Sequence, residues 1–124
     1  MASIGRDGSK GVVIGVDPHP GSHMACAMDA TGRVVGECEV KNDEGGIEQL
    51  RAWGKAYGKC RWAVEGPATA YARRMVARLR EAGEEVVGIA PAMTAQYRGK
   101  RWRGKNDRID AANAARALLA NPEL

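Results

Sequence analysis

The stretch GVVIGVDPHPG, from Gly11 to Gly21, decides the fold. Its first part is a short run of apolar, mostly β-branched residues, which is typical of a buried strand. Asp17 ends this run, and two prolines and a glycine follow within four residues. Proline cannot donate to a strand ladder, and proline and glycine favour turns. The pattern therefore predicts a central strand over residues 11–17 that stops at an acidic side chain and a tight turn.

The residues that follow predict a mixed sheet. Short turns between the first three apolar segments favour an antiparallel meander, and later apolar segments alternate with helical periodicity. Asn42 or Asp43 suits the N-cap of the first helix, and Gly58 and Gly83 suit helix ends. The expected elements are strands over residues 22–29, 33–40, 61–65 and 85–89, and helices over residues 44–57, 69–82 and 107–119. The sequence therefore predicts an α/β fold, in the order β-β-β-α-β-α-β-α, with helices on the faces of the sheet.

The chain has the size and composition of one globular domain. Its 124 residues are 44% hydrophobic and 27% charged, which excludes a collagen-like, coiled-coil or fully disordered chain. We expect a polar lead-in over residues 1–10, one domain over residues 11–120 and a tail over residues 121–124. No secretory signal or membrane span is recognisable, so we expect a cytoplasmic protein with no membrane partner. Its three cysteines lack C-x-x-C spacing and are expected to be free thiols: Cys26, Cys38 and Cys60.

Positive charge gathers in the C-terminal half of the chain. Residues 1–66 carry 8 basic and 9 acidic side chains, whereas residues 67–124 carry 11 basic and 6 acidic ones. The segment 96–105 interleaves cations with aromatic rings. The cations can neutralise phosphates, and the rings can stack on unpaired bases. The alternative is a solvated loop whose tryptophan packs into the core. The predicted nucleic-acid contacts are Arg98, Lys100, Arg101, Trp102, Arg103 and Lys105, and further candidates are Arg73, Arg74 and Arg78.

Four carboxylates stand where the predicted elements begin or end. Asp17 and Glu65 end two strands, which meet at one sheet edge if the strands are parallel neighbours. Asp107 and Asp110 are spaced i, i+3 and share one helix face. Converging carboxylates repel one another unless a cation lies among them, and oxygen ligands favour Mg²⁺ or Mn²⁺. Two such ions form the usual clamp for phosphodiester chemistry. Taken singly, each acid also suits an ordinary turn, strand end or first helical turn.

Three motifs carry a resemblance to a known family. GVDPHPGSH at residues 15–23, WAVEG at residues 62–66 and RGKNDRIDA at residues 103–111 resemble the N-terminal RuvC-like domain of the insertion-sequence one-ten family of DEDD transposases. The resemblance spans residues 11–119 and implies a RuvC-like, ribonuclease-H-like fold. It assigns the family's catalytic and metal-binding acids to four positions, which are Asp17, Glu65, Asp107 and Asp110.

The resemblance also implies partners that the residues alone do not reveal. Proteins of this family are recombinases guided by a structured RNA that bridges target and donor DNA. Their acidic domain binds Mg²⁺, and a serine of a separate C-terminal domain is the expected nucleophile. The serines of this sequence, Ser3, Ser9 and Ser22, match no motif of that C-terminal domain, so we expect that domain to be absent here. The sequence departs from the family pattern at Asn106 and at Pro67-Ala68.

Two main functions remain open from the sequence. The first is the N-terminal catalytic domain of a DNA transposase or recombinase, which acts on phosphodiesters with Mg²⁺ and is inactive alone. The alternative is a non-catalytic nucleic-acid-binding module that uses the basic loop 96–105. An actin-like sugar kinase is disfavoured because Pro18-His19-Pro20 replaces the small phosphate-binding residues after Asp17. His19 and His23 suit either a turn or a metal pair, and an alanine-rich face suggests self-association.

Overall fold

The structure, a computed structural model, describes residues 11–95 and 109–124 and the helical backbone of residues 107 and 108. Its centre is a five-stranded sheet with the order β3-β2-β1-β4-β5. The strands are β1 (Val13–Pro18), β2 (Ser22–Met28), β3 (Val34–Lys41), β4 (Arg61–Glu65) and β5 (Glu85–Ile89). β2 pairs antiparallel with β1 and β3, whereas β4 lies parallel to β1 and β5. The predicted mixed sheet is confirmed.

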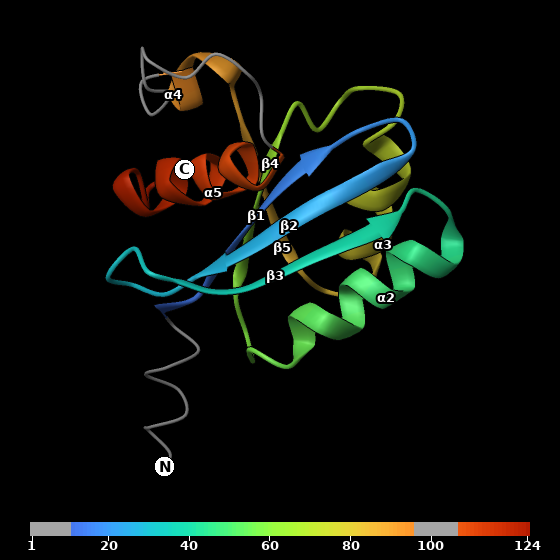
Figure 1. Ribbon diagram of the computed structural model, residues 1–124, viewed down its shortest axis with the longest axis horizontal. Coiled ribbons are helices and arrows are strands. Elements are labelled where there is room, and N and C mark those ends of the chain that lie inside the picture. Colours follow the sequence, from blue (N-terminus) through green and yellow to red (C-terminus); the bar gives the residue numbers. More distant parts are fainter. Residues whose placement is uncertain (1–10, 96–106) are drawn as a thin grey trace.

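Helices cover both faces of this sheet. They are α2 (Glu44–Lys55), α3 (Arg73–Glu81), α4 (Pro91–Ala95) and α5 (Asp107–Ala120). Figure 1 shows α5 on one side of the sheet and α2 and α3 on the other. Each side has its own apolar core, one between the sheet and α2 and α3 and one between the sheet and α5. This layered arrangement is the one that the order of elements predicts.

The strand alternation decides which side of the sheet the acidic residues face. Val16 of β1 and Val64 of β4 both pack in the core formed with α2 and α3. Successive residues of a strand point to opposite faces. The next residues, Asp17 and Glu65, therefore lie on the side of α5.

Helix α5 packs closely on the sheet because its contact residues are small. Five of its alanines are buried, namely Ala111, Ala112, Ala114, Ala115 and Ala117. A Cβ placed on Gly15 of β1 would lie 2.0 Å from the Ala111 carbonyl oxygen and 2.6 Å from the Ala115 nitrogen. Only glycine therefore lets the helix backbone rest on β1 at this point. The alanine-rich surface, expected to stay uncovered, is buried between α5 and the sheet. Self-association itself stays a prediction.

Apart from shifts of one or two residues at the ends of other elements, the structure differs from the expected elements at two places. The helix expected over residues 69–82 spans Arg73–Glu81, because the preceding residues form turns in which the Thr69 hydroxyl donates to the Gly66 carbonyl at 3.0 Å. Tyr71 therefore lies outside the helix and is 38% exposed. The second difference is α4, which the sequence reading did not predict. Pro91 begins it, and proline is well suited to a first helical position that needs no backbone N–H.

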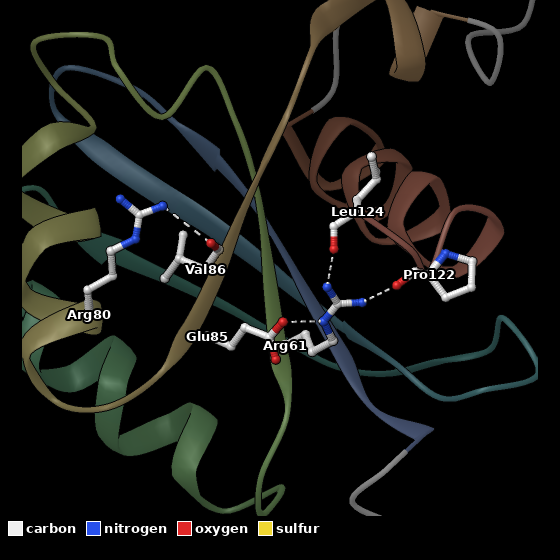
Figure 2. A network of polar contacts seen from close by, with 6 residues as sticks. All are labelled: Arg61, Arg80, Glu85, Val86, Pro122 and Leu124. Carbon is white, nitrogen blue, oxygen red and sulfur yellow. Dashed lines mark hydrogen bonds and ion pairs between the residues drawn. The ribbon is translucent and has the colours of Figure 1, made fainter.

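Arg61 ties residues 122–124 to the sheet (Figure 2). Its Nε donates to the Glu85 carboxylate at 2.9 Å. Its two terminal nitrogens donate to the backbone oxygens of Pro122 at 2.9 Å and Leu124 at 2.5 Å. Arg61 and Glu85 begin the parallel strands β4 and β5. This network therefore lies at the opposite end of these strands from Glu65.

Two expectations drawn from composition can be compared with the structure. The three cysteines form no disulfide, which confirms the expected free thiols. Burial raises the pKa of the Cys26 and Cys60 thiols to about 11, with smaller contributions from nearby charges. In the part of the chain that the structure describes, no helix combines the length and the apolar character needed to cross a bilayer.

Candidate active site

Two of the four predicted acids end neighbouring parallel strands. Val16 of β1 is the register partner of Val64 of β4. The residues that follow them, Asp17 and Glu65, therefore lie side by side at the carboxyl ends of these strands. Asp17 is 8% exposed, and Glu65 is half-buried. The sheet topology thus brings together two carboxylates that are 48 positions apart in the sequence.

Helix α5 supplies the third acid. Asp110 lies in the first turns of this helix and is 5% exposed. The close approach at Gly15, two residues before Asp17, seats α5 on β1 directly beside this edge. Asp107 begins α5, but its side chain lies outside the described residues. Its predicted place among the acids therefore stays a prediction.

The electrostatics of Asp17 show that the three described carboxyl groups interact. Burial raises the pKa of Asp17 because the charged form is poorly solvated inside the protein. The neighbouring His19 opposes this effect through its charge and its hydrogen bond, while the charges of Asp110 and Glu65 raise the pKa further. Groups from β1, β4 and α5 therefore lie near enough to repel one another.

Two neighbouring side chains hold these carboxylates in place. His19 Nε2 lies 2.9 Å from Asp17 Oδ2 and donates a hydrogen bond to it. The buried Thr94 hydroxyl lies 3.0 Å from Glu65 Oε2 and 3.0 Å from the Pro91 carbonyl oxygen. Sequence reasoning missed Thr94, because the contact joins positions 29 residues apart. The one available signal was Pro91, whose place at a helix start positions Thr94 one turn later.

The donor chemistry of these acids suits a hard divalent cation. Asp17, Glu65 and Asp110 offer only oxygen atoms, which Mg²⁺ and Mn²⁺ prefer. Within residues 11–95 and 109–124, however, no three His, Cys, Asp or Glu side chains gather closely enough to hold an ion. Mutual repulsion of the carboxylates opposes such a gathering when no positive charge lies between them. Asp107 is the one predicted ligand whose side chain that range does not include.

Asn42 joins the loops around this edge of the sheet. Its amide nitrogen donates to the carbonyl oxygens of Pro20 and Tyr71, each at 3.1 Å. Its Oδ1 lies 2.9 Å from His23 Nε2, so that nitrogen carries the hydrogen. Its own carbonyl oxygen accepts from Arg74 at 2.8 Å. His23 is fully buried, and its Nδ1 has no hydrogen-bond partner in the described part of the structure.

The predicted nucleic-acid contacts fall mostly outside the described residues. This holds for Arg98, Lys100, Arg101, Trp102, Arg103 and Lys105. Of the further candidates, Arg74 is engaged with Asn42 and Arg78 donates to the Glu44 carboxylate at 2.7 Å. Arg73 is exposed, and no described residue pairs with its guanidinium. The basic surface therefore stays a prediction, and Arg73 is its least engaged member within the described helix.

Comparisons with known proteins agree on the fold and the family. A family model for DEDD transposases of the insertion-sequence one-ten (IS110) type, described as "Transposase", matches residues 14–124. Two solved structures of RuvC from Thermus thermophilus, one in complex with a Holliday junction substrate, are similar with a TM-score of 0.67 and 15% identity. Each covers 90% of this chain, which spans 94% and 95% of the two RuvC chains. A comparison with curated protein sequences finds no match.

The structural likeness and the family match support each other. At 15% identity, the likeness to RuvC establishes a RuvC-like fold and nothing finer. The family match covers almost all of the described residues, including the ends of β1 and β4 and the whole of α5. The chain therefore belongs to the DEDD transposase family of the insertion-sequence one-ten type.

Proposed function

We propose that this chain is the nuclease-type catalytic domain of a DNA transposase, which acts on phosphodiesters with the help of divalent cations. The observation that carries the proposal is the convergence of acids from three separate elements. Asp17 is buried at the end of β1, and its pKa is raised by burial and by the charges of Asp110 and Glu65. A fold has no structural need to collect repelling carboxylates at one edge, so we infer that a cation holds them together.

The proposed ligands are the four acids that the family resemblance assigns. Mg²⁺ would be held by Asp17, Glu65, Asp107 and Asp110. Mn²⁺ is the alternative ion, because it also prefers oxygen ligands. When bound, a pair of such ions supplies Lewis-acid stabilisation of the charge that develops on the phosphodiester oxygens.

The other residues of the site orient these ligands. His19 donates to one oxygen of Asp17 and thereby fixes the rotation of its carboxylate. Thr94 does the same for Glu65 from the short helix α4. Hydrogen bonds of this kind around metal ligands limit their motion and support their affinity for the metal. We propose that both are positioning residues for the acidic site.

The remaining partners extend the proposal beyond this chain. We propose DNA as the substrate, supported by the transposase family match and by the DNA junction bound in one of the similar RuvC structures. The family resemblance further suggests a structured guide RNA and a C-terminal domain with a serine nucleophile for strand transfer. Because the acids alone supply no such nucleophile, we expect this chain by itself to bind metal without completing strand transfer.

Metal-dependent stabilisation tests the proposal without requiring catalysis. An ion that binds only the folded protein stabilises it by about 2.7 kcal/mol at a concentration of 100 times its dissociation constant. Mg²⁺ should therefore raise the melting temperature of the wild-type chain, and the variants Asp110→Asn and Asp107→Asn should lose most of this response. Glu48→Gln is the matched control, because it removes one negative charge from an exposed pair with Arg51 on α2.

The Mg²⁺ response of the melting temperature in these proteins supports or overturns the proposed metal site. A response that is lost in both aspartate variants and retained in the control supports a metal site at these acids. An equal response in all four proteins, or no response of the wild type to Mg²⁺ or Mn²⁺, overturns the proposal.

A further inference from the structure

A groove of about 430 Å³ is lined by helix α3 and by residues 67–68, which follow β4. Four of its lining residues are apolar and are called the floor here, namely Pro67, Ala68, Val76 and Ala77. The other two, the exposed Arg73 and Arg80, are called the rim. Its volume falls within the range of about 300–1,000 Å³ that is usual for small-ligand sites. The groove is therefore large enough to receive part of a ligand and is not a packing defect.

The helical wall of the groove is one continuous face of α3. Residues 73, 76, 77 and 80 follow the i, i+3, i+4, i+7 spacing that places side chains on one side of a helix. The seven-residue spacing sets the two arginines about 10 Å apart along the helix axis, because each residue rises about 1.5 Å. Two cations thus flank an apolar strip between them.

The wall of the groove opposite α3 is formed by residues 67 and 68, and Pro67 packs against the edge strand β5. Pro67 packs over Gly88 of β5, so that a Cβ on this glycine would lie 2.8 Å from Pro67 Cγ. Gly66 adopts a positive φ of 63°, and the Thr69 hydroxyl donates to its carbonyl oxygen, which turns the chain into this wall. Because the wall begins two residues after Glu65, the groove and the acidic residues meet at the carboxyl end of β4.

The two rim arginines of α3 form no ion pair with a described carboxylate. Arg74 is engaged with the Asn42 carbonyl oxygen, and Arg78 pairs with the Glu44 carboxylate. Arg80 donates only to the backbone oxygen of Val86, at 3.3 Å (Figure 2), and Arg73 has no partner among the described residues. No described carboxylate therefore neutralises either rim guanidinium.

We propose that this groove binds a single-stranded nucleic-acid segment, with its phosphates on Arg73 and Arg80 and a base or sugar on the apolar floor. Guanidinium groups suit phosphates. The aliphatic floor offers apolar contact to the faces of bases, which are exposed in an unpaired strand and stacked inside a duplex. An acidic peptide added as a strand to β5 is disfavoured, because Arg80 already occupies the Val86 oxygen on that edge. The choice of nucleic acid rests on the proposed function.

Binding of a fluorescently labelled oligodeoxythymidylate, measured by anisotropy in EDTA, tests this assignment. The double variant Arg73→Gln/Arg80→Gln should weaken binding about tenfold or more, because charge-assisted contacts are lost. It should also lower the slope of log affinity against log salt concentration by about 1.4, since each phosphate contact of a single strand contributes about 0.7. Ala77→Glu, on the exposed floor of the groove, should weaken binding at least as much. Arg78→Gln is the control for each arginine of the double variant, because it removes one positive charge from the same helix outside the groove.

The outcomes separate the proposed occupants. Preference for oligodeoxythymidylate or oligouridylate over duplex DNA supports the assignment, and the better of the two identifies the natural strand as DNA or RNA. Equal losses in Arg78→Gln and in the groove variants, or equal competition by duplex DNA or polyglutamate, overturn it. Because EDTA removes divalent ions, this binding measurement does not depend on occupancy of the proposed metal site. Failure of the groove proposal would therefore appear in oligonucleotide binding, whereas failure of the metal-site proposal would appear in the Mg²⁺-dependent melting temperature.

Discussion

Gly15 lies so close to Ala111 that a Cβ on the glycine would fall 2.0 Å from the alanine carbonyl oxygen. The contact joins β1 to α5, two elements at opposite ends of the chain. Gly15 stands two residues before Asp17, and Ala111 directly follows Asp110. The packing of a small residue against helix backbone therefore sets the relative position of two carboxylates of the candidate site.

Replacement of this glycine should damage both the fold and the site. Gly15→Ala forces α5 away from β1, and overpacking of this kind typically costs about 1–3 kcal/mol of unfolding free energy. The displaced helix also carries Asp110 away from Asp17, so the Mg²⁺-dependent rise in melting temperature should shrink. Urea denaturation and thermal melts with and without Mg²⁺ measure the two effects.

Gly21→Ala provides the control for this substitution. Gly21 is exposed, and a Cβ placed on it meets no atom within 4 Å. Its stability and its metal response should stay close to those of the wild type. Equal losses in both variants would show that the effect comes from glycine replacement in general and not from the contact with α5.

The sequence predicts the sheet well because its strands are short apolar runs bounded by turns. The segments 61–65 and 85–89 are strands with the predicted ends. The parallel pairing of β1 with β4, which the sequence leaves as a condition, is supplied by the structure. Helix α4 and the contact of Thr94 with Glu65 were not predicted, because they depend on packing between distant segments. The start of α3 at Arg73 depends on turns around Thr69, which helical periodicity cannot detect.

The sequence likewise predicts only part of the candidate site. Positions at strand ends locate Asp17 and Glu65, because parallel neighbours must meet at one edge. The spacing of Asp107 and Asp110 shows only that they share a helix face, and the place of that face depends on Gly15. That glycine was read as part of an apolar strand, since its role becomes visible only when α5 lies over it.

His23 should make the stability of the protein depend on pH in the mildly acidic range. Burial lowers its pKa from the ordinary value of 6.5, with a small opposing effect of the hydrogen bond to Asn42 and small lowering effects of His19 and Arg74. The fold therefore favours the neutral imidazole, and the unfolded chain binds more protons below pH 6.5. Unfolding free energy should be fully retained above pH 6.5 and should fall as the pH drops below it.

Urea denaturation over this pH range, with two variants, assigns the effect. The chain holds two histidines, so His23→Gln should flatten the loss of stability near pH 6, whereas His19→Gln should retain it. A wild-type stability that does not change between pH 7 and pH 5.5, or a slope that disappears in His19→Gln instead, would contradict the assignment to His23. The upper limit lies about half a unit above the ordinary histidine pKa, and the lower limit lies about one unit below it.

Arg61→Met should release residues 122–124 from the sheet with only a modest loss of stability. The guanidinium is partly exposed and joins the Glu85 carboxylate and two backbone oxygens, and exposed ion pairs contribute about 0–1 kcal/mol. Faster hydrogen exchange at residues 121–124 should accompany this small change. Arg33→Met is the control, since Arg33 is largely exposed and lies 3.8 Å from Asp29 at a turn. Unchanged exchange in Arg61→Met would show that the network does not hold this segment.

Asp17→Asn should stabilise the protein without metal and destabilise it relative to wild type with Mg²⁺. The amide keeps an acceptor for His19 but removes a charge that burial, Asp110 and Glu65 all disfavour, as the raised pKa of Asp17 indicates. Asp29→Asn is the control of opposite sign, because hydrogen bonds from Thr31 and Arg33 lower the pKa of Asp29 and stabilise its charge. That variant should be less stable in EDTA and in Mg²⁺ alike. If Asp17→Asn also loses stability in EDTA by urea denaturation, the carboxylate serves the fold itself, and the argument for a cation at this edge loses its basis.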